Sequence, residues 1–187
     1  MAALETPPVT AGWKAPDFKL KGTDGKFYSL ANAKGPKGLV VMFICNHCPF
    51  VRAIADKLAR DMKELAALGI GSIAVMANDV ENYPDDSFDN MILFKEKHSF
   101  PFPYVIDETQ EVAKAYDAVC TPDFFGFGPD LALQYRGRLD ESGMKRIEGG
   151  KRELFEAMKQ VAETGKAPAA QTPSIGCSIK WRENSAA

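Results

Sequence analysis

Two patterns of apolar and polar positions follow each other along the chain. An uninterrupted apolar run, typical of a strand buried on both faces, lies at 39–44, and residues 70–77 and 104–106 predict a second buried strand and a third short one. After the first run, residues 51–68 place apolar side chains every three or four positions, which predicts an amphipathic helix. Weaker helical patterns lie at 91–97, from 107 to about 119, and at 151–163.

Short apolar runs at both ends of this series predict antiparallel strands. Residues 18–21 and 27–30 flank Thr23-Asp24-Gly25, and Asp-Gly between apolar runs is a hairpin signal. Near the other end, residues 124–127 and 131–139 predict two further strands around a Gly-Pro-Asp turn. Strands that alternate with helices indicate an α/β fold with a mainly parallel sheet covered on both faces.

Composition narrows the functional classes. The 187 residues suit one domain with a sizeable core, and a net charge of −2 without a basic block argues against a nucleic-acid surface. No apolar segment approaches the ~20 residues that span a bilayer, and residues 1–12 lack the apolar stretch of a signal peptide. We therefore expect a cytoplasmic protein, in which four cysteines indicate redox or metal chemistry rather than structural disulfides.

The motif Cys45-Asn46-His47-Cys48 stands where the first buried strand gives way to the amphipathic helix. The partial positive charge and free N–H groups of a helix N-terminus favour a thiolate, the reactive form of cysteine. We expect the pKa of Cys45 to lie below the free value of about 8.5. Cys45 would then attack a disulfide, and Cys48 would resolve the mixed disulfide. His47 either adds positive charge beside the thiolate or is an exposed turn residue.

Other roles for the cysteine pair compete with disulfide exchange. Cys45 and Cys48 could be small buried residues, or they could bind a metal together with His47 and Cys120. A four-ligand zinc site is disfavoured, because the chain has only two histidines and no second Cys-x-x-Cys. We therefore expect neither a resident metal nor a cofactor.

Three further motifs accompany the cysteine pair. Residues 15–18 read Ala-Pro-Asp-Phe and are followed by Asp24-Gly25-Lys26, while residues 107–116 form a helical segment that ends shortly before Thr121-Pro122. In this order, the motifs resemble the thioredoxin fold over about residues 13–165. More closely, they resemble its peroxiredoxin-like branch, the alkyl hydroperoxide reductase and thiol-specific antioxidant proteins. In that branch the Thr-Pro turn contains a cis-proline and faces the cysteines.

The resemblance implies a fold, a set of site residues and an activity. It implies one thioredoxin-like domain over residues 1–187, with an N-terminal hairpin extension before the core and a tail from 166 onward. His47, Thr121 and Pro122 would contact the substrate. The expected activity is that of a thiol–disulfide oxidoreductase; a thiol peroxidase with antioxidant activity and a copper-binding thioredoxin-fold module are the alternatives. Its partners would be disulfide-containing proteins or small thiol compounds and an electron donor, not nucleic acid or membranes.

One departure from the peroxiredoxin pattern matters for the activity. Typical members carry Pro-x-x-x-Thr/Ser-x-x-Cys. If Cys48 is the cysteine of this motif, Val41 and Cys45 occupy the Pro and Thr/Ser positions. If Cys45 is that cysteine, Gly38 and Met42 occupy them. The hydroxyl that would orient a peroxide is missing from the local motif, so we expect weak peroxidase activity.

The remaining cysteines and several polar residues have less specific expectations. Cys120, two positions before the proline, is either a buried structural thiol or an auxiliary redox thiol. We expect the tail to be ordered by Trp181 on the flank of the domain, with Cys177 not bonded to Cys45. Arg136 and Arg138 are expected to be solvated, and His98 to be a surface or packing residue.

Overall fold

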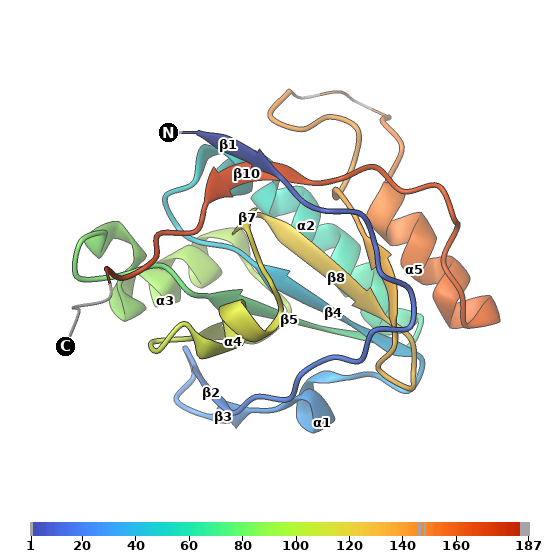
Figure 1. Cartoon of the computed structure of the whole chain (residues 1–187), viewed down its shortest axis with the longest axis horizontal. Coiled ribbons are helices and arrows are strands. Elements are labelled where there is room, and N and C mark those ends of the chain that lie inside the picture. Colours follow the sequence, from blue (N-terminus) through green and yellow to red (C-terminus); the bar gives the residue numbers. More distant parts are fainter. Residues whose placement is uncertain (1, 146, 148, 184–187) are drawn as a thin grey trace.

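The computed structural model describes residues 2–145, 147 and 149–183, and its centre is a seven-stranded sheet in the order β3-β2-β6-β5-β4-β8-β9 (Figure 1). The strands are β2 (Leu20–Gly22), β3 (Phe27–Tyr28), β4 (Gly38–Phe43), β5 (Ile70–Met76), β6 (Tyr104–Ile106), β8 (Asp123–Phe127) and β9 (Leu133–Arg136). Strands β4, β5 and β6 are parallel, while the hairpin β2–β3 and the pair β8–β9 are antiparallel. The α/β fold class and the presence of the predicted strands are confirmed, although the strands expected at 18–21, 27–30 and 131–139 are shorter. The sheet is mixed and not mainly parallel, because β2 also pairs antiparallel with β6, and β8 with β4.

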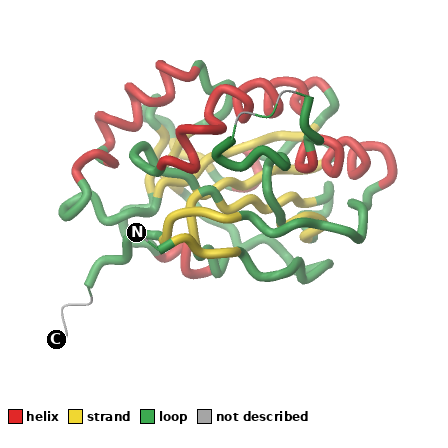
Figure 2. The backbone as a smooth tube through the Cα atoms, turned by 90° about the horizontal axis from the view of Figure 1, so that it is seen from above, coloured by secondary structure: helices red, strands yellow, loops and turns green. Residues whose placement is uncertain are grey.

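Two hydrophobic layers enclose this sheet because successive side chains of a strand point to opposite faces. On β4, Val40 and Met42 pack with apolar residues of α2 (Pro49–Ala67), α3 (Phe88–His98) and α5 (Glu153–Thr164). Leu39 and Val41 point to the other face, towards α1 (Leu30–Ala33) and α4 (Glu111–Ala115). In Figure 2 the longer helices lie on one side of the strands. Across the described ranges, none of the helices combines the length and the apolar character needed to cross a bilayer.

The helix α2 begins directly after the cysteine motif. Cys48 is its N-cap and Pro49 occupies its first turn, where the missing N–H of proline costs little. The helix ends before Gly69, which has a positive φ of 88° that favours glycine. The strand β4 and the helix α2 therefore hold the four residues 45–48 in a short, fixed connection.

Two local predictions are wrong at their boundaries. The helix expected from residue 107 to about 119 is only α4, because residues 107–110 form a turn in which the Asp107 carboxylate accepts a hydrogen bond from the Ala113 amide. Asp117 then adopts a positive φ of 52°, which ends helical geometry. In addition, the short helix α1 begins at Leu30, the last residue of the expected strand 27–30.

A second, three-stranded sheet joins the two ends of the chain. It has the order β1-β10-β7, in which β1 (Ala3–Glu5) and β10 (Ile175–Ser178) lie beside β7 (Cys120–Thr121), next to the start of α2 (Figure 1). The tail is thus ordered by strand pairing and not, as expected, by Trp181, whose side chain is 41% exposed. As a result, the last strand lies at the edge of the molecule that carries the cysteine pair.

Candidate active site

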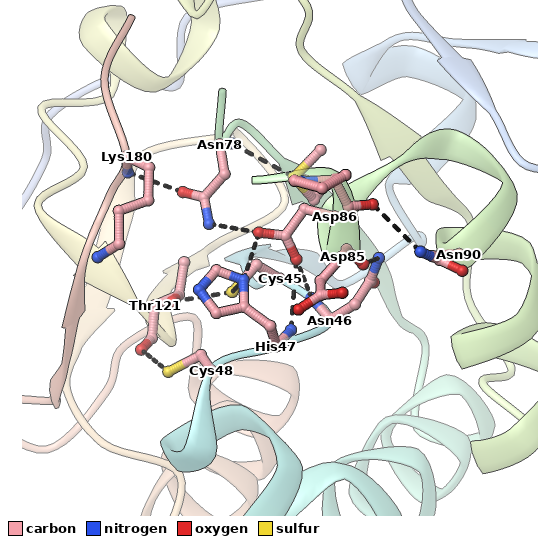
Figure 3. Close-up of polar contacts among 12 residues, drawn as sticks. Cys45, Asn46, His47, Cys48, Asn78, Asp85, Asp86, Asn90, Thr121 and Lys180 are labelled. Carbon is pink, nitrogen blue, oxygen red and sulfur yellow. Dashed lines mark hydrogen bonds and ion pairs between the residues drawn. The ribbon is translucent and has the colours of Figure 1, made fainter. Parts of the chain in front are cut away.

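Cys45 and Cys48 lie side by side between β4 and α2, next to the turn that contains Thr121 (Figure 3). The Cys45 sulfur is 3.5 Å from the Thr121 hydroxyl oxygen, and the Cys48 thiol donates to the Thr121 carbonyl oxygen at 3.2 Å. Both cysteines are buried, with exposures of 1% and 0%. A single residue from a distant part of the chain therefore contacts both sulfurs, one through its side chain and one through its backbone.

The peptide bond between Thr121 and Pro122 is cis, as the resemblance predicted. This turn follows β7 and leads into β8, which pairs with β4, the strand that ends just before Cys45. The topology thus explains why the Thr-Pro turn and the cysteine motif, some 75 positions apart in the sequence, meet at one edge of the sheet.

His47 is fixed by a buried carboxylate that the sequence did not identify. Its Nδ1 atom lies 2.6 Å from Asp86, which also accepts hydrogen bonds from the backbone amides of Asn46 and His47 and from the Asn78 side chain (Figure 3). The His47 ring also stacks on Tyr83, with 5.9 Å between ring centroids. His47 is therefore neither an exposed turn residue nor a free cation.

The position of the His47 nitrogens limits what this residue can do. The Cys45 sulfur lies 3.9 Å from Nδ1, the same atom that Asp86 holds, while Nε2 is buried without a hydrogen-bond partner. A cysteine–histidine–aspartate relay needs the sulfur and the carboxylate on different ring nitrogens. The geometry accordingly assigns His47 to orienting and polarising Cys45 rather than to relaying its proton.

The pKa values of the two cysteines are shifted in opposite directions, and the lowered pKa is not that of Cys45, as expected. The hydrogen bond from Cys45 lowers the pKa of Cys48 to about 4, with further help from the Cys177 thiol and the Val51 amide at the start of α2. The same hydrogen bond, burial and the Asp86 carboxylate raise the pKa of Cys45 well above its usual range. The expectation of a lowered pKa at Cys45 is therefore wrong: the lowered pKa is that of Cys48, the N-cap of α2, mainly through Cys45 and only in small part through the start of the helix.

The comparisons with known proteins agree with this geometry. A family model described as the AhpC/TSA family matches residues 11–136. This chain belongs to the AhpC/TSA family. Peroxiredoxin Bcp of Bacillus subtilis (strain 168) is 28% identical over 109 residues, which are 58% of this chain and 64% of that protein. The thiol-disulfide oxidoreductase ResA of the same organism is 26% identical over 122 residues, which are 65% of this chain and 64% of ResA. The matches thus span less than two thirds of either relative.

Solved structures place this AhpC/TSA family member in the thioredoxin fold. An uncharacterized conserved protein from Geobacillus kaustophilus is 44% identical, with a TM-score of 0.93 over 99% of both chains. The thioredoxin domain of a thiol-disulfide oxidoreductase from Bacteroides vulgatus superposes with a TM-score of 0.64 at 17% identity, over 83% of this chain and 99% of that one. The predicted family branch and fold class are therefore confirmed.

The other two cysteines of the AhpC/TSA family member differ in their surroundings. Cys120 is fully buried, its thiol donates to the Pro122 carbonyl oxygen at 3.6 Å, and burial raises its pKa. Cys177 belongs to the same hydrophobic cluster as Cys45 and Cys48, and it pairs with Thr121 across β10 and β7. Cys120 is thus buried, as the expectation of a structural thiol has it, while its alternative role as an auxiliary redox thiol stays a prediction. Cys177 is the cysteine that clusters with the pair.

The sequence alone did not identify three residues of the site, Asn46, Asn78 and Asp86. Asn46 accepts from the Tyr104 hydroxyl, and Asn78 links Asp86 to the backbone of Lys180 in the tail. The only signal for Asn78 and Asp86 is the long polar segment of residues 78–90 after β5, since long polar loops often border a site.

Two other polar residues, Arg136 and His98, differ in whether they match the expectations from the sequence. Arg136 is buried and forms an ion pair with Asp123 at 2.9 Å, so the expectation that it is solvated is wrong. His98 packs against Phe94 and Phe100 and contacts Asp56, as a packing histidine should.

The same cluster contains three groups that could hold a metal ion. The ligand atoms of Cys45, His47 and Asp86 lie within 4.8 Å of one another. This set replaces the predicted combination of Cys45, His47, Cys48 and Cys120, because Asp86 takes the place of the other cysteines. His47 Nδ1 already contacts Asp86, so a metal bound through that atom would have to displace this contact.

Proposed function

We propose that this protein is a thiol–disulfide oxidoreductase whose Cys45 and Cys48 alternate between a dithiol and a disulfide. The observation that carries the proposal is the contact of both adjacent sulfurs with Thr121, beside the cis-proline. Because only a thiolate is nucleophilic, a pair that loses its first proton near pH 4 holds a reactive sulfur throughout the physiological range. Membership of the AhpC/TSA family and the similarity to ResA support this assignment.

The reaction consists of two thiol–disulfide exchanges. In the first, the proton on Cys45 moves to Cys48 along their hydrogen bond, and the Cys45 sulfur attacks one sulfur of the substrate disulfide. The second substrate sulfur leaves as a thiolate. Cys48 then attacks the Cys45 sulfur of the mixed disulfide, passes its proton to the substrate sulfur that leaves, and closes the Cys45–Cys48 bond. The substrate gains two electrons, and an external thiol donor must return the same number to the protein.

The order of attack follows from the surroundings of the two sulfurs. Cys45 faces the polar side chains of His47 and Thr121, whereas Cys48 is enclosed by the Thr121 carbonyl, the Cys177 thiol and the start of α2. Cys45 therefore meets the substrate first and Cys48 resolves the intermediate. His47, held by Asp86, keeps its Nδ1 beside Cys45, where it can stabilise this sulfur when it becomes the leaving group.

A groove of about 180 Å³ beside Pro122 offers a site for the substrate. Apolar side chains, including Phe50, Ile54 and Phe124, line it together with three charged residues, Glu5, Arg138 and Asp140. Such a mixed groove fits a peptide segment or a small disulfide that carries both apolar and polar groups. We therefore propose disulfide-containing peptides and small disulfides as the substrate class.

A side-by-side assay tests the function. Reduction of insulin disulfides, with dithiothreitol as the electron donor, is compared with consumption of hydrogen peroxide. We expect the wild-type protein to accelerate insulin reduction, Cys45→Ser to abolish the acceleration, and Cys120→Ser to leave it nearly unchanged. In addition, Cys48→Ser should accumulate a mixed disulfide on Cys45. Equal activity of wild type and Cys45→Ser would refute the proposal.

A thiol peroxidase is the second candidate, and one contact favours it. The local motif lacks the expected hydroxyl, but the cis-proline turn brings the Thr121 hydroxyl to 3.5 Å from Cys45. The cation that would assist a peroxide is less well placed, because Arg52 donates to the Asn46 backbone carbonyl instead of a sulfur. Rapid stoichiometric oxidation of Cys45 by micromolar peroxide, lost in Thr121→Val and kept in Thr121→Ser, would rank the peroxidase first.

A further inference from the structure

The strand β10 borders the active site, because it pairs with the strand that carries Thr121. It pairs antiparallel with β7, with Cys177 opposite Thr121 and Ser178 opposite Cys120. Thr121 is the residue whose hydroxyl and carbonyl contact the two active-site sulfurs. An extended peptide substrate would reach those sulfurs by pairing with the same backbone, so β10 lies where a substrate strand would lie.

The side chain of Cys177 points from this strand into the cysteine pair. Cys177 is 5% exposed and packs in one hydrophobic cluster with Cys45 and Cys48. Cys177 stands directly opposite Thr121, so its side chain lies on the same face of the β7–β10 pair as the Thr121 side chain that contacts Cys45. Burial and Cys48 raise the pKa of Cys177, and Cys177 in turn helps to lower the pKa of Cys48. A Cys48–Cys177 disulfide requires the two sulfurs to approach to about 2.05 Å.

We propose that Cys177 is a third redox thiol of this site, which exchanges with the Cys45–Cys48 disulfide to form a Cys48–Cys177 disulfide. This inference rests on the proposed function, which supplies the Cys45–Cys48 disulfide. In the step, the Cys177 sulfur attacks the Cys48 sulfur, and the new bond forms as the bond between Cys48 and Cys45 breaks. The electron pair of the broken bond leaves on Cys45, which takes up the proton that Cys177 has lost. No electrons enter or leave the protein.

The exchange changes which sulfur is free and what the tail can do. Cys45 becomes a thiol again, beside Thr121 and His47, while Cys48 is tied to β10. The tail is already linked to the site by Lys180, whose backbone amide donates to Asn78, which in turn donates to Asp86. A Cys48–Cys177 bond therefore fixes β10 in the place of a substrate strand and holds the oxidised protein closed.

Disulfide mapping tests the inference directly. The reduced full-length chain is oxidised with oxidised dithiothreitol, quenched in acid, alkylated with N-ethylmaleimide and digested with trypsin. Cys45 and Cys48 fall in one tryptic peptide, 38–52, and Cys177 falls in another, 167–180. We expect a covalent link between these two peptides in the wild type, with the maleimide on Cys45. The link should be lost in Cys48→Ala and Cys177→Ala, and it should be the main product in Cys45→Ala.

The controls separate this inference from the proposed function and from unspecific oxidation. Cys120→Ser should give the same link as the wild type, because Cys120 contacts the Pro122 carbonyl. An internal disulfide in peptide 38–52, with no link to 167–180 in either the wild type or Cys45→Ala, would overturn the third thiol and leave the oxidoreductase intact. Absence of the internal disulfide together with loss of insulin reduction would instead overturn the proposed function. A Cys120–Cys177 link of equal yield would also overturn the inference.

Discussion

Replacing Asp86 with asparagine tests whether the buried carboxylate organises the cysteine motif. Asp86 accepts four hydrogen bonds: from the amides of Asn46 and His47 at 2.8 and 3.3 Å, from His47 Nδ1 at 2.6 Å and from Asn78 at 2.9 Å. An asparagine keeps one acceptor oxygen and turns the other into a donor. In either orientation, this donor would face two of the existing donors.

The magnitude follows from the two lost contacts. Hydrogen bonds to a charged group contribute about 1.5 kcal/mol or more each, so Asp86→Asn should lower the free energy of unfolding by about 3 kcal/mol. For a chain of this size, that corresponds to a decrease of about 6–12 °C in Tm. The negative charge of Asp86 also contributes to the raised pKa of Cys45, so its removal should lower that pKa.

Asp85→Asn is the matched control, because it removes the same charge one position away. The Asp85 side chain is exposed, and only its backbone carbonyl contacts Asn46. Thermal unfolding measures the stability change, and alkylation of Cys45 followed over pH measures the change in pKa. If Asp86→Asn matched Asp85→Asn in both Tm and the pH profile, the proposed role of the carboxylate would be wrong.

Three further predictions concern the closed tail, the thiolate and the buried ion pair. A methyl group at Gly176 would collide with the Thr121 carbonyl oxygen, so Gly176→Ala should separate β10 from β7 and speed alkylation of the cysteine pair. The control Gly128→Ala places its methyl group next to the flexible side chain of Asp130 and should leave the alkylation rate unchanged. Thiolate absorbance near 240 nm should persist as pH falls to about 4, where the Cys48 thiolate takes up a proton. Cys48→Ser should remove this absorbance. Loss of the wild-type absorbance already at pH 7 would contradict the assignment to Cys48. Arg136→Met leaves the Asp123 carboxylate buried without its cation, so the free energy of unfolding in urea should fall by about 3–5 kcal/mol. Adding Asp123→Asn should recover most of this stability. No recovery would mean that packing, not charge, explains the loss.

Local sequence patterns were sufficient for the framework of this protein. Apolar runs and the amphipathic period of α2 located the central strands and the main helix, because burial on one or both faces leaves a direct periodic trace. The cysteine motif at the end of β4 and the Thr121-Pro122 turn also followed from the sequence, since both are short motifs with a fixed place in the fold. Their meeting at one edge required only the order of the elements.

The charges and partners within the site depend on contacts between distant positions. Asp86 and Cys177 reach the cysteine pair from two separate segments whose local sequence does not identify them, and the contact of the Thr121 hydroxyl with Cys45 depends on the fold. The choice of Cys48 over Cys45 as the thiolate arises because hydrogen bonds and the Asp86 charge act over a few ångströms in space. Likewise, Arg136 is buried because Asp123 on the neighbouring strand can pair with it. Periodicity records which faces are buried, whereas the pairing of polar groups inside those faces is set by how the chain folds back on itself.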